Sequence, residues 1–138
     1  RLQNMGTPDY LISAACSLVL AQRLARKTCK ECRVPDEDVT PKVLTDLGFT
    51  PELASRVKAI KGKGCPKCKD SGYKGRMGIY ELMKVTKPIK EAILKQATTP
   101  ELKAIAVKEG FQTMQDMGRK MMAAGDLSFR EFERVLSS

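Results

Sequence analysis

Four of the five cysteines form two CxxC pairs, "CKEC" at Cys29 and Cys32 and "CPKC" at Cys65 and Cys68, in a chain without histidine. A two-residue gap lets both thiolates of a pair turn toward one ion, and two such pairs supply the four ligands of a tetrahedral site. Four sulfur ligands favour zinc first and an iron–sulfur centre second. Because four protein ligands leave no position open for a reacting water, the predicted role of the metal is structural.

Two other uses of paired cysteines remain open. Disulfides suit a short secreted protein, but this chain has an odd number of cysteines and opens without a leader-like segment. A redox pair is the stronger alternative, although such a pair normally lies between a strand and the start of a helix, whereas Cys29 is expected to follow a helix. Cys16 lies on the apolar stripe of that helix and is expected to be a core residue.

The chain is strongly basic, with a formal net charge of +9. This balance favours an anionic partner, such as an acidic protein face, an anionic lipid surface or a nucleic acid. Cations beside the cysteines would also favour the thiolate forms that bind metal. A nucleic-acid module, the alternative from another functional class, would use Tyr73 for stacking and the cations Lys58, Lys61, Lys63, Lys74 and Arg76.

The sequence contains no motif typical of catalysis. GxxxxGK[ST], GxGxxG and HExxH are all missing, and without histidine the usual general base is missing too. Solvent exposure and helix capping are expected to account for Glu81 and Glu131. The uncharged apolar run of residues 11–21 is shorter than the roughly 18 residues that a membrane span needs. We therefore predict no catalytic or cofactor-binding residue in this chain.

The dipeptide Thr-Pro occurs four times, and an apolar-periodic segment follows each time. Threonine can cap the free N–H groups of a helix, and proline fits the first turn because its missing N–H would be unpaired there anyway. A last helix is expected to begin at Ser128, with Glu131 completing a capping box. The other predicted helices cover residues 8–27, 41–47, 51–58, 88–96, 100–109 and 113–124.

Residues 72–85, "GYKGRMGIYELMKV", combine three glycines with a partly alternating run, which predicts a short β segment. The predicted fold class is therefore mainly α with a short β segment (α+β). The first cysteine pair would follow helix 8–27 directly, and the glycine-rich "KGKG", which interrupts helix formation, lies just before the second pair. A shared metal ion would then stabilise the loop-rich residues 28–75.

Four stretches carry a resemblance to a known family: "RLQNMG", "VLAQRLARKTCKEC", "GCPKCKDSGYKGRMGIYEL" and "LSFREFERV", in this order. Together they resemble the C-terminal portion of the ATPase domain in the assembly ATPases of type IV pili and of type II secretion. The resemblance covers essentially the whole chain, and the tetracysteine segment is its most specific part, because retraction-type pilus ATPases lack these cysteines. The "LGFTP" segment looks more like the pilus assembly ATPases than the secretion ones.

The resemblance implies the C-terminal part of a RecA-like ATPase domain. Residues 1–28 would be a helix of the ATPase core, residues 29–85 a tetracysteine zinc-binding subdomain, and residues 86–138 a C-terminal helical subdomain. Only Cys29, Cys32, Cys65 and Cys68 carry over, as ligands of structural Zn²⁺. The phosphate-binding loop, acidic boxes and histidine box are expected upstream of Arg1, so ATP and Mg²⁺ would belong to the full-length protein and this fragment would not hydrolyse ATP alone.

The same resemblance implies partners and a location. The family protein is a hexameric motor in the cytoplasm, peripheral to the bacterial inner membrane. Its expected partners are the neighbouring subunits of a homo-hexamer and an inner-membrane platform protein with its cytoplasmic accessory proteins, and no nucleic acid is expected. ATP hydrolysis would drive subunit rotation and pilin addition, and the zinc clamp would transmit this movement to neighbours.

Overall fold

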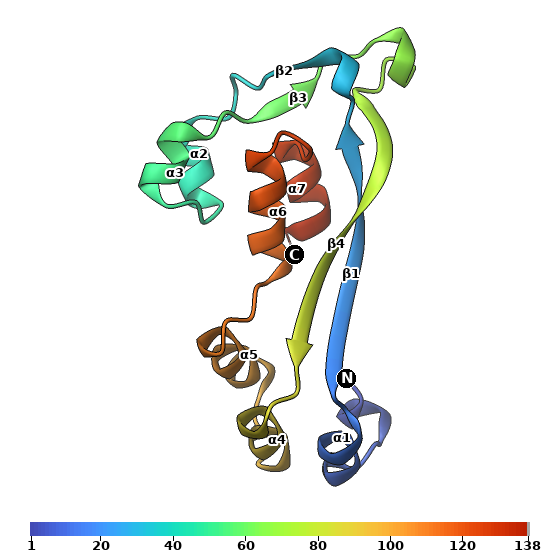
Figure 1. The fold of residues 1–138 in the computed structure, drawn as a ribbon, viewed down its shortest axis with the longest axis vertical. Helices are drawn as coiled ribbons and strands as arrows, with labels where there is room; N and C mark the ends of the chain where they lie inside the picture. The colour runs from blue at the N-terminus through green and yellow to red at the C-terminus, as the bar shows by residue number, and fades with distance from the viewer. Residues whose placement is uncertain (138) are drawn as a thin grey trace. The chain divides into compact units, whose positions relative to one another are not determined.

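The computed structural model describes residues 1–137, which form an α+β fold (Figure 1). The strands are β1 (Leu18–Thr28), β2 (Arg33–Pro35), β3 (Ile60–Gly62) and β4 (Tyr73–Lys84). The α-helices are α1 (Asp9–Ala15), α2 (Pro41–Asp46), α3 (Pro51–Arg56), α4 (Lys87–Leu94), α5 (Thr99–Lys108), α6 (Met114–Ala123) and α7 (Phe129–Leu136). Three short 3-10 turns are η1 (Gln3–Met5), η2 (Lys30–Cys32) and η3 (Pro66–Cys68).

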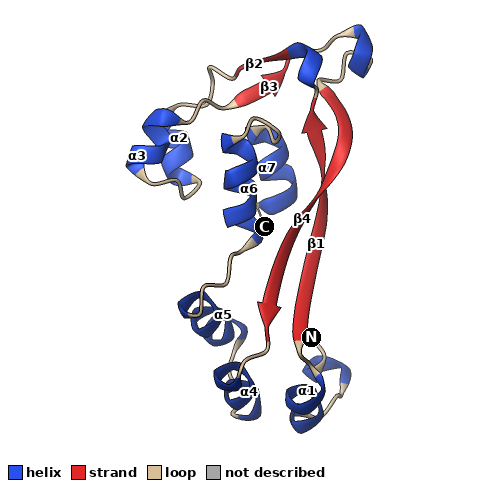
Figure 2. Ribbon diagram, in the orientation of Figure 1, coloured by secondary structure: helices blue, strands red, loops and turns tan. Residues whose placement is uncertain are grey.

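The strands form two small sheets, β1 with β4 and β2 with β3 (Figure 2). The chain divides into two compact units, and the boundary between them falls inside both long strands. Unit 1 comprises residues 1–21 and 80–113, and unit 2 comprises residues 22–79 and 114–138. Each unit thus combines two separate stretches of chain.

Unit 1 has a core centred on α4 and α5. Val85, Ile89, Ile93 and Ala106 are buried there, and α1 adds Ile12 to the cluster. The Ser13 hydroxyl of α1 donates to the main-chain oxygen of Lys90, and α1 and α4 pack together. Within residues 1–137, no helix is both long and apolar enough to cross a membrane.

The prediction of one helix over residues 8–27 is correct up to Ala15 and wrong after it. α1 ends at Ala15, Cys16 is extended with φ −79° and ψ 124°, and β1 occupies Leu18–Thr28. Leucine, alanine, arginine and lysine favour helices locally, but pairing with β4 decides the conformation here. Residues 1–28 are therefore a helix followed by a strand rather than one core helix.

The other predicted elements are confirmed to within a few residues. Thr40 and Thr50 cap α2 and α3, accepting hydrogen bonds from Val43 N at 3.4 Å and Leu53 N at 3.3 Å. The cap of α5 is Thr98, one residue before the expected Thr-Pro, and it shares a capping box with Glu101. The β segment predicted at 72–85 is β4.

In unit 2, β2 and β3 pair antiparallel, with Val34 opposite Lys61 and Pro35 opposite Ile60. Residues 36–59 leave this ribbon and return to it, and within them α2 packs against α3. α6 and α7 form a second helix pair whose surfaces meet at Gly118. A Cβ at Gly118 would lie 2.7 Å from Cε2 of Phe132, so only glycine allows this close approach.

Candidate metal centre

Unit 2 brings the four paired cysteines together, with all four Sγ atoms within 4.8 Å of one another. The Sγ atoms of Cys29 and Cys65 are 3.8 Å apart, those of Cys32 and Cys68 are 3.8 Å apart, and those of Cys65 and Cys68 are 3.7 Å apart. A disulfide would need about 2.0 Å. Tetrahedral Zn–S bonds of about 2.3 Å place sulfur atoms about 3.8 Å apart, so the cluster fits one metal ion.

The two pairs are presented by similar local structures. Cys29 follows β1 and Cys32 ends the turn η2, while Cys65 precedes η3 and Cys68 ends it. We call residues 29–32 the first knuckle and residues 65–68 the second knuckle. The main-chain N–H of Cys29 donates to the oxygen of Gly72 at 2.9 Å, which ties the first knuckle to the segment that leaves the second.

Glycines shape the second knuckle. Gly64 and Gly72 have φ of +100° and +79°, in the left-handed region that side chains disfavour. A Cβ on Gly72 would lie 2.5 Å from the main-chain oxygen of Gly62, and a Cβ on Gly62 would clash with Gly72 in turn. The chain entering the knuckle therefore touches the chain leaving it, which closes the loop that carries Cys65 and Cys68.

The thiols are poised unequally. Burial raises the pKa of Cys32 to about 12. Burial acts in the same direction on Cys68, but N–H donors of Gly72 and Cys65 at 3.3 Å, together with hydrogen bonds from the Cys65 and Cys32 thiols, lower the pKa of Cys68 to about 6. Crowded buried thiols cannot all ionise without a compensating cation, and a divalent ion would supply that charge.

This arrangement suits a structural metal ion better than redox chemistry. Cys29, Cys32 and Cys68 are buried, with exposed fractions of 0%, 2% and 6%. The argument that a helix precedes Cys29 was wrong, because β1 precedes it. What disfavours a redox pair is instead that both pairs share one cluster. Cys16 lies in unit 1, packed against its core, and is not among the clustered residues.

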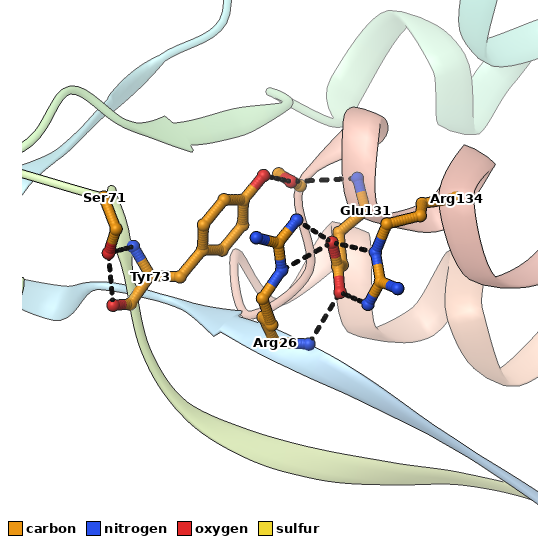
Figure 3. A network of polar contacts seen from close by, with 6 residues as sticks. Arg26, Ser71, Tyr73, Glu131 and Arg134 are labelled. Carbon is orange, nitrogen blue, oxygen red and sulfur yellow. Dashed lines mark hydrogen bonds and ion pairs between the residues drawn. The ribbon is translucent and has the colours of Figure 1, made fainter.

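A polar network between β1 and α7, unforeseen from the sequence, lies in the same unit (Figure 3). The Glu131 side chain has no exposed surface. Its carboxylate accepts hydrogen bonds from Arg26 N at 2.8 Å, from the Arg26 guanidinium at 2.8 and 3.1 Å, and from Arg134. The expectation that Glu131 is exposed and completes a capping box is wrong, since only the Ser128 hydroxyl makes its half of that box, accepting from Glu131 N.

Tyr73 belongs to this network too. The Arg26 guanidinium lies over its ring, 4.1 Å from the centroid, and its hydroxyl is 3.2 Å from that of Ser128 (Figure 3). Of the five cations considered for nucleic acid, Lys58, Lys63, Lys74 and Arg76 are exposed, while Lys61 pairs with Asp36 at 3.3 Å. The aromatic residue of that hypothesis is therefore engaged within the chain.

Comparison with known proteins identifies similar sequences over the whole chain. The model of the family described as "Type II/IV secretion system protein" matches residues 1–134. The chain is 39% identical to the type IV pilus assembly ATPase PilB of Acinetobacter baylyi and 37% identical to that of Myxococcus xanthus, over 99% and 95% of its length. It is 31% identical to the putative type II secretion system protein E of Escherichia coli over 100% of its length. The chain spans only 24%, 23% and 27% of these relatives.

Proposed function

Since the chain belongs to the type II/IV secretion system protein family, we propose that it is the zinc-bearing C-terminal part of a hexameric motor ATPase that powers type IV pilus extension. The gathering of four cysteine sulfurs into one tetrahedral-sized cluster is the observation that carries this proposal. In it, residues 1–138 have a structural and coupling role and do not hydrolyse ATP alone. ATP and Mg²⁺ act elsewhere in the full-length protein.

Cys29, Cys32, Cys65 and Cys68 are the proposed ligands of one structural zinc ion. Zinc bound by four thiolates has no open coordination position, so it would contribute rigidity and folding energy rather than a reaction. Structural zinc sites contribute roughly 10 kcal/mol or more of apparent binding energy, comparable to the net stability of a domain. The ion would hold the two knuckles together and so keep unit 2 rigid while the motor moves.

The surface of unit 1 supports a larger RecA-like parent. All the large apolar side chains that the described residues expose, except Leu24 and Leu53, belong to this unit. In β1, the successive residues Leu18, Val19 and Leu20 are exposed by 56%, 45% and 61%, although neighbours along a strand face opposite sides. Strands that are apolar on both faces are typical of buried sheets in α/β proteins.

A pilus motor is preferred to a type II secretion motor. The relatives named as pilus assembly ATPases match at 39% and 37% identity over 99% and 95% of the chain, whereas relatives named as type II secretion proteins match at 31% over all of it or at 38% over only 67% of it. Both relationships belong to one family, so the type II secretion ATPase is the alternative. A zinc-stabilised nucleic-acid module is not proposed, because Tyr73 is held by Arg26 and Ser128.

The proposed protein works in the cytoplasm, peripheral to the bacterial inner membrane. Its partners are neighbouring subunits of a homo-hexamer and the inner-membrane platform protein with its accessory proteins. Exposed cations beside the knuckles are suited to an acidic face on one of these partners. Within residues 1–137, these cations make no ion pair: Lys30, Lys63, Lys67, Lys69, Lys74 and Arg76.

The proposal is tested with Cys65→Ser in the full-length protein, and with Cys16→Ser as the matched control outside the cluster. We expect about one zinc per wild-type chain by elemental analysis, and loss of that zinc in Cys65→Ser, because three thiolates no longer close the site. Hexamer formation and pilus extension should fall while nucleotide binding is kept.

The control Cys16→Ser should retain its zinc, its hexamers and its pili. Wild-type protein without metal, or a Cys65→Ser variant with normal hexamers and piliation, would contradict the proposed role of the site. If the host of the Cys65→Ser variant had normal pili but impaired protein secretion, the type II alternative would be favoured.

A further inference from the structure

Residues 124–128 connect α6 to α7, and we call them the α6–α7 turn. One residue of this turn contacts the chain on both sides of the first knuckle. The main-chain oxygen of Asp126 accepts a hydrogen bond at 3.0 Å from the N–H of Thr28, which directly precedes Cys29. The Asp126 carboxylate pairs at 2.8 Å with the guanidinium of Arg33, which directly follows Cys32. Asp126 therefore brackets both cysteines of the knuckle without touching either sulfur.

The same turn also reaches the second knuckle. Ser128, which is only 2% exposed, places its hydroxyl 3.2 Å from that of Tyr73. Tyr73 follows Gly72, whose N–H donates to Cys68 Sγ and whose oxygen accepts from Cys29 N. The α6–α7 turn thus contacts residues next to both cysteine pairs.

The turn is itself held firmly by the start of α7. Ser128 caps this helix, and Glu131 binds both the main chain and the side chain of Arg26 in β1. Hydrogen bonds to a charged group are stronger than those between neutral groups. Since Arg26 lies two residues before Thr28, the contacts that anchor α7 and those that bracket the first knuckle meet at the end of β1.

We propose that the α6–α7 turn is a retaining clamp for the metal, with Asp126 as its principal positioning residue. This inference rests on zinc at the four cysteines, as proposed above. Releasing the ion requires the knuckles to separate, and with Asp126 in place the first knuckle cannot move without breaking contacts at both of its ends. Loss of the Asp126–Arg33 ion pair frees the end of the first knuckle that follows Cys32 and leaves the main-chain contact at Thr28. All four ligands then stay present, but the rate at which they open rises.

The experiment measures transfer of zinc from the loaded protein to an excess of a chromogenic chelator. Groups that orient metal ligands typically affect metal affinity by about 10–100-fold when removed. We expect Asp126→Ala to release zinc about tenfold faster than wild type, and Asp126→Asn, which keeps the shape, to show a smaller acceleration. Arg33→Gln should behave like Asp126→Ala, and combining the two should add little, because both remove the same ion pair.

Two controls separate a clamp from a general loss of stability. Glu52→Gln removes an ion pair with Arg56 on the exposed surface of α3 and should leave the release rate unchanged. Leu44→Val weakens the buried packing of the α2–α3 pair, and Leu44 is not among the residues of the cysteine cluster. It should therefore lower the melting temperature more than it accelerates release.

Zinc release at the wild-type rate from both Asp126 variants would overturn the clamp and leave the zinc centre standing. The clamp would also be overturned if Leu44→Val and Asp126→Ala had the same melting temperature and released zinc equally fast. Wild-type protein that holds no zinc would overturn both this inference and the proposed metal centre.

Discussion

Glu131 keeps its charge in a position with no exposed surface because five nitrogen–oxygen hydrogen bonds replace the water it has lost. Burial, the largest single influence, raises the pKa of this carboxyl, but the combined hydrogen bonds from Arg134 and Arg26 lower it from the usual 4.5 to about 2. The folded state therefore binds this proton less tightly than the unfolded chain does. The contribution of Glu131 to stability is complete above about pH 4.5 and is lost as the pH falls toward 2.

We expect Glu131→Gln to lower the free energy of unfolding by about 2 kcal/mol at neutral pH, because one of the two accepting oxygens becomes an NH2 group that cannot accept the hydrogen bonds of Arg26 and Arg134. The difference between wild type and variant should shrink as the pH falls from about 4.5 toward 2. Denaturant unfolding at each pH measures the free energy of unfolding of both proteins. Acid causes loss of zinc from both, so this effect cancels in the difference between them. Glu52→Gln, on the surface, should show almost no difference at any pH. A constant gap across this range would contradict the assignment.

At the residue scale, the cysteines could be found from the sequence and the residues that support them could not. The CxxC spacing is local, so it predicts two knuckles that could share an ion without knowledge of the fold. Asp126 and Glu131 meet Arg33 of β2 and Arg26 of β1 only because the α6–α7 pair comes together with these strands in space. The only signal for Glu131 was a capping box, and that signal pointed to the wrong partner.

The α6–α7 pair depends on the absence of a side chain at Gly118. In an isolated helix, replacing glycine with alanine would be stabilising by about 1 kcal/mol. Here the added Cβ would clash with Leu136 and come within 2.7 Å of Phe132, both in α7. Whether replacing Gly118 with alanine raises or lowers the stability therefore shows whether the two helices pack as closely as in the structure.

We expect Gly118→Ala to be destabilising by about 1–3 kcal/mol, the usual cost of overpacking a core. Thermal unfolding of the zinc-loaded protein measures it. Ala123→Ser, at an exposed position of the same helix, should change stability by less than about 0.5 kcal/mol. A Gly118→Ala variant more stable than wild type would mean that the helix propensity of alanine decides the outcome, and that α7 does not pack against α6 at residue 118.

Elements were predictable where local chemistry defines them. Threonine, proline and glycine mark helix ends by capping and by backbone conformation, so α2, α3 and the later helices were found. β1 was missed because "LVLAQRLARK" contains good helix formers and few β-branched residues. Its strand conformation comes from pairing with β4 in the second half of the chain, which no local pattern contains.

At the scale of the whole molecule, metal dependence should be confined to one of the two units. All four cysteines of the cluster lie in unit 2. The unit 1 core, formed by Val85, Ile89, Ile93 and Ala106, includes none of them. Removal of zinc should therefore loosen one unit and leave the packing of the other.

We expect chelation to raise amide hydrogen exchange most in the knuckles, in β2 and β3, and at the start of α7, which the Asp126 and Glu131 contacts connect to them. Peptides from α4 and α5 should exchange at the rate seen in the zinc-loaded protein. Mass spectrometry on the full-length protein before and after chelation makes the comparison. Uniform loss of protection across both units would show that the ion supports the whole fold.

The pairing of Pro35 with Ile60, reinforced by the hydrogen bond from Asp36 N to Ala59 O at 2.8 Å, closes residues 36–59 at their base. Zinc ribbons usually place about 15–20 residues between their cysteine pairs, and the longer interval in this chain contains the α2–α3 pair. The distance between the knuckles is set below that base, so residues 36–59, which Arg119 of α6 also contacts at the main-chain oxygen of Leu47 (2.9 Å), are not needed to position the sulfur atoms. This segment could lengthen, shorten or accept a foreign sequence during evolution or engineering without moving a single sulfur atom.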